Sequence, residues 1–123
     1  MRRLLYILTV VFGVLPAIAL SYDDPVPTND WDALSLPGAF ALMRHALAPG
    51  TGDPADLDLD DCASQRNLDA RGRAQAVAIG DAFRARGFGF DAVLTSEWCR
   101  CRDTADLLDL GPVETEPAFN SFF

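Results

Sequence analysis

Short apolar runs alternate with two longer helical patterns after residue 38, and this order restricts the chain to an α/β architecture. The run Ala39–Met43 is continuously apolar, which is typical of a strand buried on both faces of a parallel sheet. The pattern predicts further elements in this order: a helix over 68–87 with Asp69 as its N-cap, a strand over 90–94, a helix over 97–108 and a strand from Val113. Parallel strands joined by helices predict a mostly parallel sheet flanked by helices.

The charge of the chain limits its possible partners. The 123 residues carry a net charge of −8, and every one of the ten basic residues is arginine. A nucleic-acid-binding protein needs a basic surface to neutralise phosphates, so we expect no nucleic-acid partner. A few well-placed arginines can still hold one phosphate group, which leaves a phosphorylated small molecule or a phosphate anion as the expected ligand.

Residues 1–19 have the pattern of a signal peptide. Arg2 and Arg3 precede the apolar run 4–15, and Ala17-Ile18-Ala19 provides a cleavage site with small residues. A retained N-terminal anchor is the alternative, because the apolar run is nearly long enough to span a bilayer. We expect cleavage, with no stable membrane insertion afterwards, and therefore an exported protein that is periplasmic or secreted.

Polar side chains follow the first two of the expected strands, at the edge of the sheet where α/β proteins bind ligands. Arg44 and His45 follow the first strand, Thr95-Ser96 follow the second, and Arg100 lies one turn into the next helix. The amino terminus of that helix favours an anion, and two guanidinium groups can hold phosphate oxygens. An imidazole beside them is a candidate nucleophile toward phosphorus.

Simpler readings of the same residues stay open. A lone histidine at a strand end is usually structural, and Arg100 could pair with one of the many acidic residues. Three interpretations of the chain are therefore possible. It could be an enzyme, a domain that binds phosphate without catalysis, or a disulfide-linked structural domain in which His45 has no function.

Three sequence blocks stand out, and they are Leu42-Met43-Arg44-His45-Ala46, Asn67-Leu68-Asp69-x-x-Gly72-x-x-Gln75-Ala76 and Leu94-Thr95-Ser96-Glu97-x-x-Arg100-x-x-x-Thr104-Ala105. In this order they resemble the motifs of the histidine phosphatase (phosphoglycerate mutase-like) superfamily. The chain resembles an exported, bacterial-type member of this superfamily. The resemblance implies phosphomonoester hydrolysis through a phosphohistidine intermediate. It implies that His45 is phosphorylated, that Arg44 and Arg100 bind the phosphate, and that neither a metal nor an organic cofactor is needed.

The chain also departs from the family pattern. Ala46 replaces the usual glycine, and the second histidine that the family places late in its sequence is missing, since His45 is the only histidine. We therefore expect a domain truncated at the C-terminus: residues 20–37 form a lead-in and 38–123 the N-terminal part of a histidine phosphatase domain. Such a chain could be inactive, and the alternative is a non-catalytic phosphate-binding or vestigial domain.

The general acid is not fixed by these patterns. The resemblance places the family's proton donor near or beyond the end of this chain. Glu116 is the first candidate for this role, with Glu114 and Asp53 as alternatives.

Three cysteines, Cys62, Cys99 and Cys101, have the spacing C-x36-C-x-C. This spacing matches no common zinc site, and export would favour a disulfide. Helix geometry alone leaves Cys99 and Cys101 open as partners of Cys62. The family resemblance contributes to a preference for Cys62–Cys99, with Cys101 as the free thiol.

Overall fold

The computed structural model describes residues 29–121, so the expected signal peptide and most of the lead-in lie outside the described residues. The chain divides after Ala41 into two compact units. The first contains the short helix α1 (Asp30–Leu34), whose N-cap Asn29 accepts the backbone N–H of Asp32 at 3.0 Å. The second unit contains the other helices and strands of the described residues and all residues of the expected site.

The helix α2 (Ala70–Arg84) is the longest element of the second unit. The Asp69 side chain caps it by accepting the backbone N–H of Gly72 at 2.8 Å, as the sequence predicted. The chain leaves the helix through Gly87, whose φ of +79° suits a residue without Cβ. Local sequence signals therefore define both ends of this helix.

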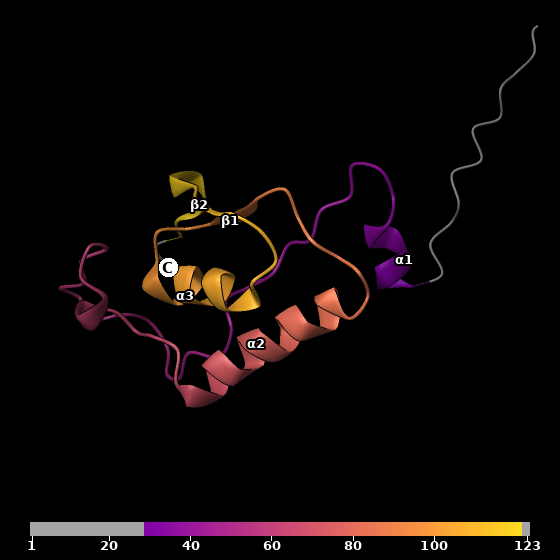
Figure 1. The fold of residues 1–123 in the computed structure, drawn as a ribbon. Coiled ribbons are helices and arrows are strands. Elements are labelled where there is room, and N and C mark those ends of the chain that lie inside the picture. Colours follow the sequence, from indigo (N-terminus) through magenta and orange to yellow (C-terminus); the bar gives the residue numbers. More distant parts are fainter. Residues whose placement is uncertain (1–28, 122–123) are drawn as a thin grey trace, which may run out of the picture. The chain divides into compact units, whose positions relative to one another are not determined.

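A parallel β-α-β unit follows. The strands β1 (Val93–Thr95) and β2 (Val113–Thr115) pair in parallel, with Val93 opposite Val113. Helix α3 (Cys99–Leu108) connects them and packs between the two strands and α2 (Figure 1). Two short 3₁₀ helices, η1 (Cys62–Ser64) and η2 (Pro117–Phe119), complete the unit. The fold thus belongs to the α/β class that the sequence predicted, and its parallel sheet is small.

The expected strand over Ala39–Met43 is wrong. This segment has no regular secondary structure, and Phe40 and Leu42 are 80% and 87% exposed. A strand exists only where a neighbour supplies its backbone hydrogen bonds, and the described sheet contains β1 and β2 alone. The apolar run predicted burial that the described residues do not provide, because an apolar run cannot show that a neighbouring strand is present.

Close backbone contacts fix α2 against the segments that flank it. A Cβ atom at Gly72 would overlap the Leu47 carbonyl oxygen, and one at Gly80 would overlap the Leu108 carbonyl oxygen. The small core beside these contacts consists of Ala46, Ala48, Leu68 and Ala76, with Leu107 packed against it. The chain that follows His45 is therefore held directly on the surface of α2.

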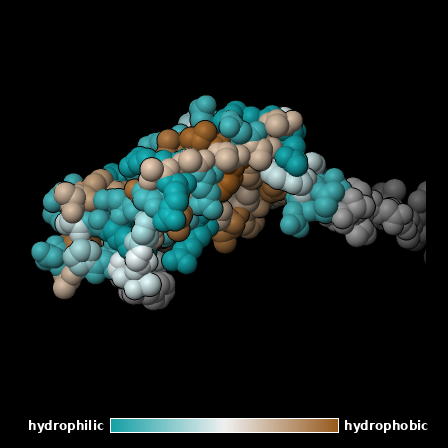
Figure 2. Space-filling view, turned by 90° about the horizontal axis from the view of Figure 1, so that it is seen from below, coloured by the Kyte–Doolittle hydropathy of each residue, from teal (hydrophilic) through white to brown (hydrophobic). Residues whose placement is uncertain are grey.

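Several large apolar side chains of the second unit remain on its surface. They are Leu42, Met43, Leu47, Val77, Leu94 and Phe119. Figure 2 shows apolar residues among hydrophilic ones on one face of the molecule. Across residues 29–121 no helix combines the length and the apolar character needed to cross a membrane.

Candidate functional site

Hydrogen bonds rather than a strand position the chain around His45. The backbone N–H of Ala46 donates to Thr104 Oγ1 at 3.0 Å, and the Thr104 hydroxyl donates to the Arg100 carbonyl at 2.7 Å. One residue further, the backbone N–H of Leu47 donates to Gln75 Oε1 at 2.8 Å. His45 is thereby tied to the first turns of α3 and to the middle of α2. Thr104 and Gln75 belong to the sequence blocks described above, but the sequence assigned them no role.

The His45 ring has one nitrogen fixed by the backbone. His45 Nδ1 lies 2.6 Å from the Ala46 carbonyl oxygen, and because a carbonyl only accepts, Nδ1 carries the proton. In the neutral ring the lone pair is then on Nε2. Burial lowers the pKa of His45 from its ordinary 6.5, and the charges of Arg100, Arg44 and Arg66 lower it further, while the Ala46 bond raises it. The ring is therefore neutral at pH 7, with Nε2 available as a nucleophile.

The protonation of His45 can be measured directly, because the chain has no second histidine. An NMR titration should give a pKa below 6.5, and Arg44→Gln should raise it by removing one of the charges that lower it. The exposed Arg71→Gln is the matched control and should leave the pKa unchanged. The unfolded chain binds this proton more readily, so the histidine stabilises the fold above about pH 6.5 and less as the pH falls below it. A wild-type pKa above 6.5 would contradict this account.

Arg100 is buried in the first turn of α3, and three groups surround its guanidinium. Nη1 donates to Asp53 Oδ1 at 2.9 Å and to the Arg66 carbonyl at 3.4 Å. The guanidinium carbon lies 4.3 Å from the centre of the Trp98 ring, within the range of a cation–π contact. Nε is buried and has no hydrogen-bond partner. One edge of the guanidinium is thus anchored, and the other contains a buried donor without an acceptor.

Arg66 is a residue of the site that the sequence reasoning did not assign. Its Nε donates to the Gly52 carbonyl at 2.9 Å, and its Nη1 donates to the Ala48 carbonyl. Its backbone N–H donates to Asp53 Oδ1 at 3.0 Å. Arg66 therefore closes the 46–61 loop onto the entry to α2, and its charge acts on His45. The signal in the sequence was its place directly before the Asn67-Leu68 block, close to that loop.

The other predicted site residues differ in how the structure places them. Arg44 is exposed, and its side chain makes no hydrogen bond or ion pair within the described part of the chain. The Glu116 side chain accepts the backbone N–H of Ala118 at 2.9 Å, and the Glu116 backbone N–H donates to Thr95 at the end of β1. No hydrogen bond joins Glu116 to His45 in the described residues, and its role as general acid stays a prediction.

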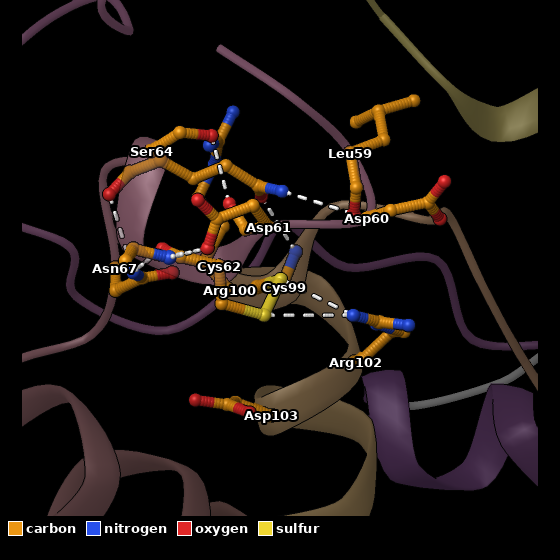
Figure 3. The surroundings of a disulfide bond; sticks show 12 residues. Leu59, Asp60, Asp61, Cys62, Ser64, Asn67, Cys99, Arg100, Arg102 and Asp103 are labelled. Atoms are coloured by element: carbon orange, nitrogen blue, oxygen red, sulfur yellow. Dashed lines mark hydrogen bonds between the residues drawn. A yellow bond between two sulfur atoms is a disulfide. The ribbon is translucent and has the colours of Figure 1, made fainter.

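A disulfide joins Cys62 to Cys99, with the two Cα atoms 5.7 Å apart, and Cys101 remains a free thiol. Arg102 Nη2 lies 3.2 Å from Cys99 Sγ and 3.6 Å from Cys62 Sγ (Figure 3). The backbone N–H of Cys99 donates to Gln65 Oε1 at 2.9 Å. The start of α3, where Arg100 lies, is thus connected both covalently and by a hydrogen bond to the segment that precedes α2.

The described residues do not form a metal-binding site of clustered side chains. Between residues 29 and 121, no group of three or more His, Cys, Asp or Glu side chains is placed to hold a metal ion.

Comparison with known protein families agrees with the sequence blocks. The family model of the histidine phosphatase superfamily (branch 1) matches residues 41–122, which is two thirds of the chain and includes every residue discussed above for the site. No curated protein matches the chain. On the strength of the matched length, the chain belongs to the histidine phosphatase superfamily.

Proposed function

We propose that this protein hydrolyses phosphomonoesters through a phosphohistidine formed at His45. The observation that carries the proposal is a neutral imidazole joined through Ala46 and Thr104 to the backbone of Arg100, whose buried guanidinium is incompletely bonded. The lowered pKa of His45 leaves the Nε2 lone pair available, and the buried Nε of Arg100 lacks an acceptor. A phosphate oxygen would supply that acceptor, and the exposed Arg44 adds a second positive charge.

The proposed reaction has two steps. In the first, Nε2 of His45 attacks phosphorus, the P–N bond forms and the bond to the ester oxygen breaks, with the alcohol taking a proton as it leaves. In the second, water attacks phosphorus and gives a proton back to the group that protonated the alcohol, the P–N bond breaks and inorganic phosphate is released. Arg44 and Arg100 neutralise the charge on the equatorial oxygens in both steps. We assign the proton donor to Glu116, which lies beside the end of β1 through its backbone bond to Thr95.

Detection of the intermediate tests the proposal. The protein is incubated with p-nitrophenyl phosphate, quenched, and examined for a phosphate that is stable to alkali, labile to acid and located on His45. Mass spectrometry should find this group in wild type and not in His45→Asn. Any steady-state turnover should fall at least about a thousandfold in the variant, as for removal of other enzyme nucleophiles. A phosphate that remains in His45→Asn would contradict the assignment.

A second function is favoured by one observation, the presence of a single histidine in the chain. In this reading the protein binds phosphate without turnover. Vanadate or phosphate binding by calorimetry, together with no phosphohistidine, would select it over the enzyme. Absence of both binding and phosphohistidine would refute both functions.

We also propose export to an oxidising compartment. The support is the Cys62–Cys99 disulfide together with the signal-peptide pattern of residues 1–19. Isolation of protein beginning near residue 20 from the exported fraction would agree with this, whereas a retained Met1 would not.

A further inference from the structure

Asp53 forms the contact that orients the guanidinium of Arg100. Their side chains are 10% and 9% exposed, and they meet at 2.9 Å between Asp53 Oδ1 and Arg100 Nη1. The same carboxylate oxygen accepts the backbone N–H of Arg66 at 3.0 Å. A residue of the 46–61 loop is therefore bound at once to α3 and to the segment before α2. Such a connection fixes position as well as charge.

The hydrogen bonds of the Arg100 guanidinium in the described residues all lie at one nitrogen, Nη1. Nη1 holds both of the acceptors described, Asp53 and the Arg66 carbonyl. Nε is buried without a partner, and the described residues offer no hydrogen bond to Nη2. Nε and Nη2 form the edge that binds two oxygens of a phosphate side by side. The structure thus leaves the bidentate edge free while the opposite corner is fixed.

We propose that Asp53 is a positioning residue for phosphate binding, which holds Arg100 so that its Nε and Nη2 edge is presented to the ligand. The inference rests on the proposed function and also revises one expectation, since Asp53 was an alternative general acid. A carboxylate oxygen that already accepts two N–H groups is an anchor rather than a proton donor. The alternative is that Asp53 occupies the place of the phosphate and competes with it.

Two substitutions separate an anchor from a competitor. In Asp53→Asn the amide oxygen can still accept from Arg66 and Arg100, so an anchor keeps the phosphate Kd within about threefold of wild type. In Asp53→Ala the anchor is lost, and the Kd should rise at least about tenfold, equivalent to one hydrogen bond to a charged group. A competitor would give tighter binding in both variants.

The experiment measures phosphate and vanadate binding by calorimetry on the full chain. Asp56→Ala is the matched control, because Asp56 is exposed and belongs to the same loop, and its replacement removes the same charge. The Kd should change by less than about twofold, since the charge of an exposed side chain is screened by solvent and salt. In parallel, the Arg100 Nε–H resonance in NMR spectra should shift on phosphate addition in wild type and in Asp53→Asn. This signal reports the proposed edge and does not respond to a general loss of stability.

The outcomes are distinct. Unchanged or tighter binding in folded Asp53→Ala overturns the proposal. Should Asp53→Ala fail to fold, Asp53→Asn decides: a Kd within about threefold of wild type together with the Arg100 Nε–H shift supports an anchor, and a larger change in Kd in either direction overturns it. If wild type binds phosphate and Arg100→Ala does not, the phosphate site stands even when the Asp53 inference fails, and the phosphohistidine on His45 still tests the enzyme separately. If wild type neither binds phosphate nor forms the phosphohistidine, the proposed function itself fails.

Discussion

Replacing both Cys62 and Cys99 by alanine is expected to lower the free energy of unfolding by about 3–4 kcal/mol. The bond closes a loop of 37 residues, and its removal restores the conformational freedom of that loop in the unfolded chain. Cys99 is also 2% exposed, so the alanine leaves a small cavity at the start of α3. Urea unfolding followed by circular dichroism measures the loss, which is large beside a usual total of about 5–15 kcal/mol.

Cys101→Ala is the control for this prediction, because Cys101 forms no disulfide. It should unfold close to wild type under the same conditions. The Gln65 side chain still accepts the Cys99 backbone N–H in the double variant, so the start of α3 keeps one connection. We therefore expect the phosphate affinity of the folded protein to change much less than its stability. An unchanged unfolding midpoint in the double variant would show that the disulfide contributes nothing.

Arg100→Ala is expected to reduce both phosphate affinity and stability. Loss of a charged hydrogen bond to the ligand should cost about 1.5–3 kcal/mol, or roughly 10- to 150-fold in Kd. In the ligand-free protein Asp53 would be left buried without its ion-pair partner, which costs about 3–5 kcal/mol in such pairs. We expect the lower end of this range, because Asp53 keeps its bond from the Arg66 backbone. Calorimetry and urea unfolding measure the two effects separately.

A double-mutant cycle isolates the ion pair from the rest of the substitution. Arg100→Ala combined with Asp53→Ala removes both charges, so the double variant should be more stable than Arg100→Ala alone. Phosphate affinity should stay low in it, because the cation is still missing. Equal phosphate affinity in wild type and Arg100→Ala would exclude Arg100 from the site, and strictly additive stability losses would show that the pair does not interact.

Local sequence signals were sufficient for α2 and α3, but they predicted neither α1 nor the two 3₁₀ helices. The Asp69 cap and Gly87 bound α2, and the alternation of apolar runs predicted the β-α-β order of β1, α3 and β2. The boundaries shifted by a few residues, since β1 begins at Val93 and α3 at Cys99. Capping and periodicity act within one or two turns of the chain, so the sequence contains them in full.

The Ala39–Met43 segment shows that local sequence is not sufficient to predict a strand. Its composition favours a buried strand, yet a strand is completed by backbone groups from another part of the chain. The expectation that a strand positions His45 is therefore wrong. Thr104 and Gln75 hold the following residues in place of a strand, and their hydrogen bonds join positions 58 and 28 residues apart.

The sequence by itself determined the chemical identity of the site: one histidine next to an arginine, a second arginine on a helix, and three blocks typical of one family. The tertiary structure alone decided which side chains meet them. It selected Asp53 from the many acidic residues as the partner of Arg100, 47 positions away, and it brought in Arg66 as a third charge near His45. Residue type sets what a group can do, whereas its pKa and its free hydrogen-bonding edge depend on neighbours that only the folded chain brings together.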